Sequence, residues 1–118
     1  MRVPVALCGV LLCASMVPMV LAQDAVKVDP KHYSVVSEND QVRILKVHYG
    51  PNEKSVMHSH PNSVAVMLTD MKAEFTLPDG KKQTMTAKAG DAQYTPAQVH
   101  LPENTGKAMD LILVELKK

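Results

Sequence analysis

Short apolar runs, each ended by Gly, Pro or a polar cluster, follow one another through most of the chain. They are rich in Val, Ile and Tyr, and none keeps apolar residues at helical spacing for three turns, so the pattern predicts strands and no convincing helix. Eight or nine strands are expected, the clearest of them at residues 33–37, 41–49, 63–69, 72–77, 83–88, 92–95, 99–101 and 108–116.

Turn signals divide these strands into hairpins. The polar link 38–40 joins the first two strands, and Pro78-Asp79-Gly80 marks a tight turn in which Gly80 can adopt a positive φ. Turns recur about every eight to twelve residues, which is typical of a β-sandwich or barrel. No internal repeat or long linker divides residues 23–118, so we expect one all-β domain there.

The first 22 residues have the features of a signal peptide. Arg2 gives a short positive start, an apolar run follows to Leu21, and Val20-Leu21-Ala22 places small residues where a signal peptidase cleaves. The run of about nineteen residues is also long enough for an uncleaved membrane anchor. Pro4 and Pro18 inside the run favour cleavage after Ala22, and hence a secreted or periplasmic protein with no membrane attachment afterwards.

Charge and cysteine content narrow the function further. Both cysteines, Cys8 and Cys13, precede the expected cleavage point, so the mature chain has no disulfide and relies on its core or on a metal. Without Arg2 the mature chain has twelve basic and twelve acidic residues, interspersed along the sequence. Aromatic residues make up only 3% of the chain. Neither a basic patch nor a stacking surface is present, and we expect no nucleic-acid partner.

The histidines are the candidate chemistry. His58 and His60 are two residues apart, and because strand side chains alternate faces, their imidazoles point to the same side of a sheet, about 7 Å apart. Two converging nitrogens make half a metal site. His32 and His48 have no partner at metal-ligand spacing, so we expect them to be surface or hydrogen-bonded residues.

A third ligand is suggested by a resemblance. The pattern Gly50-x7-His58-x-His60-x3-Val64, followed by Gly90-x5-Pro96-x-Gln98-x-His100-x3-Asn104, resembles the two motifs of the cupin superfamily. The resemblance covers about half of the mature chain and implies a single-domain β-barrel, or jelly roll, with a metal held inside by His58, His60 and His100. Two strand–turn–strand units separate His60 from His100, so a rolled sheet can bring them together.

The sequence departs from the cupin pattern at three places. Cupins commonly place a metal-binding Glu three or four residues after the second histidine, where this chain has Val64 and Ala65. Met71 and Gln98 stand where the motifs usually have glycine. A site of three neutral imidazoles keeps the full charge of a divalent transition metal and favours anionic ligands. The resemblance implies Fe(II) for an oxygenase, and Mn, Zn, Ni or Cu remain alternatives.

Few other catalytic groups are expected around the histidines. Tyr94 and Gln98 share the parity of His100, so they are the candidate proton donor and hydrogen-bond donor of the site. The alternative for Tyr94 is a core or rim position, because Pro96 interrupts the register. Glu103 is the nearest carboxylate, but its parity is opposite to that of His100.

Apolar residues are expected to shape the pocket. Val64, Val66 and Leu68 share one face of their strand and are expected to line the pocket floor. The methionines after residue 22 show no ligand spacing, so we interpret them as core filler, with copper binding at Met57 a minor alternative.

Two classes of function remain open. One is a metal-dependent enzyme of the oxygenase type, acting on a small organic substrate. The other is a module without turnover that binds a small ligand or a metal. The expected partner is a small molecule in either case, and the resemblance leaves room for a homodimer.

Overall fold

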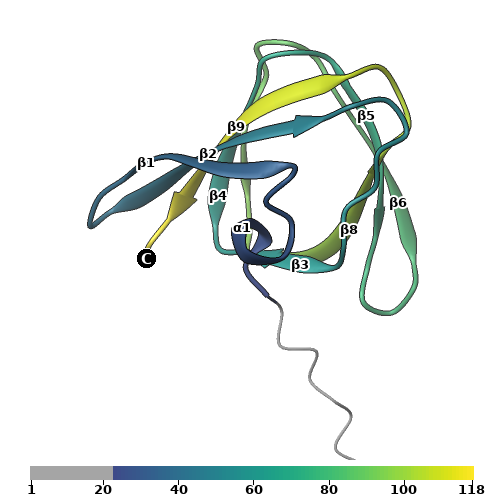
Figure 1. Cartoon of the computed structure of the whole chain (residues 1–118). Coiled ribbons are helices and arrows are strands. Elements are labelled where there is room, and N and C mark those ends of the chain that lie inside the picture. Colours follow the sequence, from purple (N-terminus) through teal and green to yellow (C-terminus); the bar gives the residue numbers. More distant parts are fainter. Residues whose placement is uncertain (1–22) are drawn as a thin grey trace, which may run out of the picture.

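A computed structural model describes residues 23–118, so the expected signal peptide of residues 1–22 lies outside the described residues. The predicted all-β class is confirmed, with one helical turn added near the start (Figure 1). Among the described residues, no helix has the length and apolarity needed to cross a membrane. The elements are α1 (Ala25–Val28), β1 (Tyr33–Glu38), β2 (Val42–Tyr49), β3 (His58–His60), β4 (Ser63–Met67), β5 (Met71–Thr76), β6 (Lys82–Ala87), β7 (Ala92–Thr95), β8 (Gln98–Asn104) and β9 (Met109–Leu116).

The strands form two antiparallel sheets. One has the order β1-β2-β9-β4-β7 and the other the order β3-β8-β5-β6. The chain passes between the two sheets at the β2–β3, β3–β4, β4–β5, β6–β7, β7–β8 and β8–β9 connections, which rolls them into a jelly roll (Figure 1). The sheets therefore enclose one interior, and residues far apart in sequence meet there.

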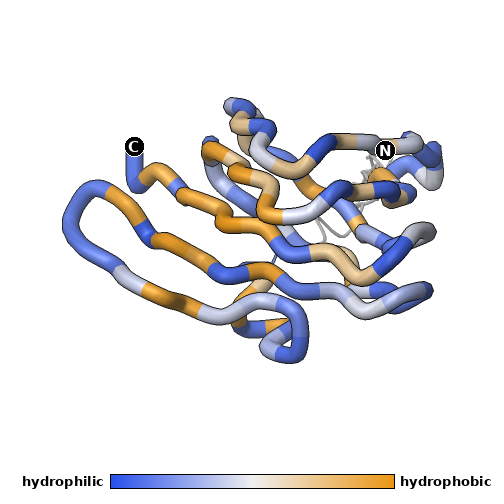
Figure 2. Tube along the Cα trace, turned by 90° about the horizontal axis from the view of Figure 1, so that it is seen from above, coloured by the Kyte–Doolittle hydropathy of each residue, from blue (hydrophilic) through white to orange (hydrophobic). Residues whose placement is uncertain are grey.

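Alternation along the long strands fills this interior. In β9 every second residue is buried, and in β2 the buried positions alternate with exposed ones toward its end. Apolar and polar segments accordingly alternate along the tube in Figure 2. Because one face of these two long strands is buried and the other is more exposed, their hydrophobic pattern fixes the register. The core includes Tyr33, Leu45, Val47, Tyr49, Met67, Met109, Leu111 and Leu113.

The predicted hairpins are present. β1 pairs with β2 across the polar link, with a bulge between Val35 and Ser37. β5 pairs with β6, and Gly80 in their turn has φ 87°. That left-handed conformation costs glycine nothing, whereas a Cβ would make it unfavourable.

One strand is longer than the sequence predicted. The expected strand 99–101 was to stop at Pro102, but β8 continues to Asn104, and Pro102 pairs with Phe75 of β5. The carbonyl of Pro102 accepts a hydrogen bond from the Ser55 amide, on the side of β8 away from β5. Since the N–H and C=O of one antiparallel residue point to the same side, the missing proline N–H faces an irregular loop and costs β8 no bond to β5.

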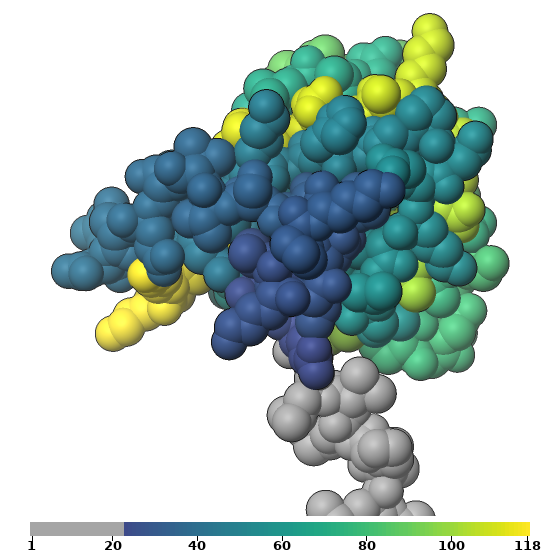
Figure 3. Space-filling view, viewed as in Figure 1, coloured from purple at the N-terminus to yellow at the C-terminus, as the bar shows by residue number. Residues whose placement is uncertain are grey.

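The first described residues pack against β3. The Gln23 carbonyl accepts a hydrogen bond from the Ser59 amide, 2.9 Å away, and Asp24 forms a parallel bridge with Ser59. In Figure 3 this N-terminal segment, in dark blue, crosses the front of the molecule. β3 is an edge strand of only three residues, so this contact holds the segment that carries His58 and His60 in place.

Candidate metal centre

The three predicted histidines meet inside the jelly roll. β3 and β8 pair in a register that sets His58 opposite His100 and His60 opposite Gln98. Directly opposed residues project to the same face of a sheet, so His58, His60 and His100 all point into the interior. All three histidines are at most 5% exposed, and one nitrogen from each lies within 4.8 Å of the others.

Hydrogen bonds fix the orientation of two of these rings. His58 Nδ1 lies 2.8 Å from the Val56 carbonyl oxygen, and His60 Nδ1 lies 2.9 Å from Glu115 Oε2. Both oxygens accept, so Nδ1 carries the proton in each ring and Nε2 keeps its lone pair. A neutral imidazole held in this way is the form that binds a metal.

Some nitrogens of the cluster have no protein partner. His58 Nε2 and both ring nitrogens of His100 are buried without a hydrogen bond. Buried polar atoms are almost always paired, and an unpaired one costs about 1–3 kcal/mol. Nitrogen donors converging in a buried site suit Zn, Fe, Ni or Cu, so the residues present fit a divalent transition metal.

The surroundings keep these rings uncharged. Burial lowers the pKa of His58 to about 4, helped by the neighbouring His60. Burial also lowers the pKa of His100 to about 2, with smaller contributions from His60 and His58. Both residues are therefore neutral at physiological pH, and neither has to release a proton before a metal binds.

A buried carboxylate that the sequence analysis missed supports His60. Glu115 is only 2% exposed, and its Oε1 accepts a hydrogen bond of 2.8 Å from Arg43 Nε. Arg43 in turn donates from Nη1 and Nη2 to the two Asp24 oxygens, at 2.9 and 2.6 Å. Asp24, Arg43, Glu115 and His60 thus form one chain of charge-assisted bonds. The sequence pattern could have predicted this inward position, because Glu115 continues the alternation of Met109, Leu111 and Leu113 in β9.

His58 is supported by a second polar network. Ser55 Oγ donates to Asp29 Oδ2 at 2.5 Å and lies 3.2 Å from His58 Nδ1. His32 joins this network through its Nδ1, 2.7 Å from Asp29 Oδ2, and its ring stacks on Tyr49 at 4.1 Å. The expectation that His32 is a hydrogen-bonded residue outside the metal cluster is therefore confirmed.

His48 also behaves as predicted. Its side chain is 55% exposed, and Nδ1 lies 2.8 Å from Asp110 Oδ1 on the outer face of the sheet. It is a surface histidine with no part in the cluster.

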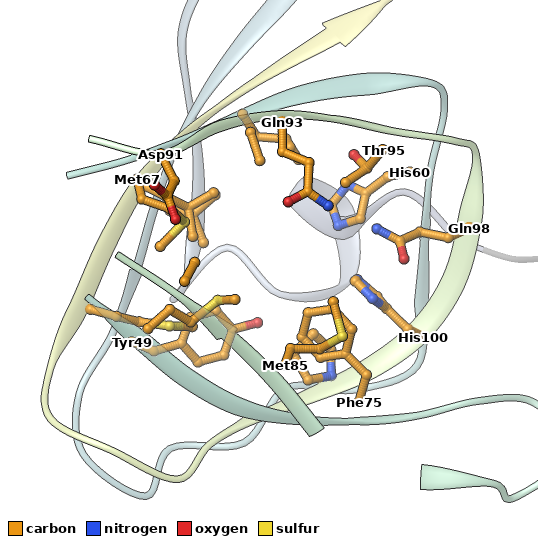
Figure 4. A pocket seen from close by; sticks show the side chains of 18 of the residues that line it. Tyr49, His60, Met67, Phe75, Met85, Asp91, Gln93, Thr95, Gln98 and His100 are labelled. Atoms are coloured by element: carbon orange, nitrogen blue, oxygen red, sulfur yellow. The ribbon is translucent and has the colours of Figure 1, made fainter. Parts of the chain in front are cut away.

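A cavity of about 110 Å³ opens beside the histidines. In the close-up, His60, His100, Gln98, Gln93 and Thr95 lie on one side, and Met67 and Asp91 lie on the other (Figure 4). No lysine or arginine lines the cavity among the described residues. A bound metal would therefore be the main positive charge available to a ligand.

Comparison with known proteins supports the architecture. No family model and no curated protein matches the sequence. Among solved structures, a cupin domain from Bordetella pertussis Tohama I aligns with a TM-score of 0.67 at 20% identity, over 73% of this chain and 92% of its own. A protein with a double-stranded β-helix domain from Klebsiella pneumoniae aligns with a TM-score of 0.56 at 26% identity, over 71% and 74%. This chain has the cupin fold.

An enzyme also appears among the similar structures. The polyketide cyclase RemF from Streptomyces resistomycificus aligns with a TM-score of 0.55 at 17% identity, over 73% of this chain and 64% of its own. At this identity the likeness concerns the cupin fold alone.

The position of the missing cupin glutamate is now defined. Ala65 lines the cavity, whereas Val64 points to the opposite face of β4. The expectation that Val64, Val66 and Leu68 line the pocket floor is wrong, and Leu68 is 52% exposed. The prediction assumed that side chains keep alternating from His60 through Pro61 and Asn62 to Val64. At Pro61 and Asn62 the chain leaves β3 in one sheet for β4 in the other, so the alternation of β3 does not continue into β4.

The prediction that Tyr94 faces the cavity is also wrong, again because parity was carried across a change of sheet. It is 54% exposed, while its neighbours Gln93 and Thr95 line the cavity, so Tyr94 points outward from β7. The chain changes sheets between β7 and β8, which breaks the parity assumed between Tyr94 and His100. Gln98, by contrast, lines the cavity as expected, and Gln93 and Thr95 are polar lining residues that the sequence analysis missed.

The remaining candidates lie outside the cluster. Glu103 pairs with Glu74 on β5, and its backbone forms an isolated antiparallel β-bridge with Lys54, away from the histidines. Met57 does not line the cavity. The other described methionines do more than fill the core, because Met67, Met71, Met85 and Met109 all border the cavity.

Proposed function

We propose that this cupin binds one divalent transition metal through His58, His60 and His100, and binds a small organic ligand in the adjoining cavity. The observation that carries the proposal is the convergence of three buried imidazoles, several of whose nitrogens lack any protein partner. Protein interiors rarely leave such atoms unpaired, and a metal satisfies His58 Nε2 and one nitrogen of His100 at once.

The charge of the site favours an anionic oxygen on the ligand. Three neutral imidazoles leave the metal its full charge, and no cation lines the cavity among the described residues. Gln98, opposite His60 in the β3–β8 register, presents an amide that can donate a hydrogen bond to an oxygen beside the metal. The protein thus binds and orients the ligand while the apolar walls exclude water.

With ferrous iron, we propose an oxygenase-type reaction. Ferrous iron supplies redox chemistry and open coordination positions when it is bound. Such a reaction needs little acid–base catalysis from the protein. The cavity lining agrees with this, because Asp91 is the one carboxylate among the described lining residues, and it is exposed and lies on the far side from His60.

A binding module without turnover is the second candidate. It is favoured by the outward position of Tyr94. The two tyrosines that do line the cavity, Tyr33 and Tyr49, are hydrogen-bonded to each other through their hydroxyls at 2.7 Å. Oxygen uptake by the iron-loaded protein with candidate ligands distinguishes the two functions, since only an enzyme consumes oxygen in proportion to ligand over many turnovers.

Export completes the proposal. The signal-like segment at residues 1–22 supports a secreted or periplasmic location, in which the mature chain begins at Gln23.

Elemental analysis of zinc- and iron-loaded protein tests the metal site. We expect about one metal per chain in the wild type and in His48→Ala, and a large loss in His60→Ala. His48→Ala is the matched control because His48 is also a hydrogen-bonded histidine, but a surface one. Equal metal content in His60→Ala and wild type would remove the basis of the proposal.

A further inference from the structure

Four methionines from four different strands meet in the cavity. Met67 comes from β4, Met71 from β5, Met85 from β6 and Met109 from β9. Residues 23–118 contain five methionines in all, so most of them border one space of about 110 Å³. Their sequence spacing gives no hint of this, because the sheets bring them together.

The strand registers set Met67 apart from the polar end of the cavity. Thr95 pairs with Ser63, which also pairs with Glu115, the partner of His60, so this rung lies at the metal end. Gln93 pairs with Ala65 one inward position further along, and Met67 lies one inward position beyond Ala65. The cavity thus runs from histidines and amides toward Met67, whereas Met85 lies beside Phe75 and nearer His100 in Figure 4.

The methionine lining suits an apolar group without charge. Thioether side chains are flexible and polarisable, so they adapt to differently shaped ligands and make favourable contacts with aromatic rings. Asp91 lies beside Met67, and its carboxylate disfavours an anion at that end. An engineered apolar cavity of roughly 150 Å³ in another protein holds benzene, so this space takes about one ring after small movements of the methionines.

We propose that these four methionines form a specificity subsite for a ligand with one anionic oxygen-bearing head and a small apolar body, about the size of a single aromatic ring. The head lies at the metal beside Gln98 and Gln93, and the body contacts the methionines. The head assignment rests on the proposed metal site, whereas the subsite for the body does not.

Three hydroxamates that share one monoanionic, metal-binding head and differ in the body test this assignment. Calorimetry with zinc-loaded protein compares acetohydroxamate, benzohydroxamate and 2-naphthohydroxamate. Burying one ring predicts binding of benzohydroxamate at least about tenfold tighter than acetohydroxamate. We expect no further gain for the two-ring compound, because the cavity is too small. Equal dissociation constants for all three would overturn the subsite.

A matched pair of variants on β6 locates the effect. Met85 lines the cavity, and the adjacent Thr84 is exposed on the other face. We expect Met85→Gln, which keeps length but adds a polar amide, to reduce the preference for benzohydroxamate over acetohydroxamate several-fold, and Thr84→Gln to leave it unchanged. An unchanged preference in Met85→Gln would place the ring elsewhere.

Toluene separates failure of the subsite from failure of the metal site. In metal-free protein, we expect saturating toluene to raise the melting temperature of wild type and Thr84→Gln, and to raise that of Met85→Gln less. If zinc does not bind but toluene still acts in this way, the metal proposal fails and the subsite stands. If zinc binds but toluene has no effect and the hydroxamates bind equally, the subsite fails alone.

Discussion

The buried pair of Glu115 and His60 gives the sharpest prediction about the metal centre. Glu115 accepts from His60 Nδ1 at 2.9 Å and from Arg43 Nε at 2.8 Å, and both Glu115 and His60 are at most 5% exposed. We expect Glu115→Gln to weaken metal binding, because the neutral amide no longer raises the basicity of the imidazole. The amide also cannot offer an acceptor oxygen to both His60 and Arg43.

The size of the effect follows from the contacts. Loss of a carboxylate behind a metal-binding histidine lowers metal affinity about 10–100-fold, or roughly 1.4–2.7 kcal/mol. The metal-free protein also loses stability, because one buried hydrogen bond to a charged partner is removed, at about 1–3 kcal/mol. Arg43 retains Asp24 and is partly exposed, so this loss stays below the cost of a fully unpaired buried charge.

Asp110→Asn is the matched control. Asp110 lies on the same strand, β9, and its carboxylate also contacts a histidine Nδ1 at 2.8 Å, but His48 is 55% exposed. We expect zinc affinity in this variant to equal that of wild type and stability to change by less than about 0.5 kcal/mol. The assay is zinc titration against a competing chelator, together with urea unfolding of the metal-free proteins.

Two results would refute the reasoning. Zinc affinity of Glu115→Gln within twofold of wild type would show that Glu115 does not influence the metal. A loss of stability without a loss of zinc affinity would show that the carboxylate supports the fold and has no role in positioning His60.

Three further predictions concern pH, the missing carboxylate and export. The pKa values of His58 and His100 are lowered in the folded state, so below about pH 6.5 the unfolded chain binds more protons and the free energy of unfolding falls toward pH 5. The slope is up to about 1.4 kcal/mol per pH unit for each histidine. Denaturation of metal-free wild type and His100→Gln should show the smaller slope in the variant, and equal slopes would contradict the shift. Ala65→Glu adds a carboxylate on the cavity face, so manganese should raise its melting temperature more than that of wild type or of Val64→Glu, which points outward. An equal manganese effect in all three would mean that residue 65 does not reach the metal. Protein recovered from its source cell should begin at Gln23 and need no detergent, whereas an intact Met1 in detergent extracts alone would favour the anchor.

The sequence predicted the features that depend on local alternation. The hairpins, the pairing of His58 with His60 on one face and the inward stripe of β9 all follow from a two-residue period within one strand. The meeting with His100 came from the cupin resemblance, and the β3–β8 register provides it physically.

The errors arose where the chain changes sheets. Val64 and Tyr94 were assigned to the cavity by counting parity across Pro61 and Pro96, but each proline lies at a corner between sheets. The methionine cluster and the Arg43–Glu115 pair were missed because they join residues from separate strands, and only the completed topology brings these together.

The position of the bound metal tests the central claim most directly. Crystals of metal-loaded protein, measured at the absorption edge of the metal, should show one anomalous peak at about 2.0–2.2 Å from a nitrogen of each of His58, His60 and His100. A peak only at a surface pair such as His48 and Asp110, or no ordered peak in fully loaded crystals, would contradict a three-histidine metal centre in this cupin fold.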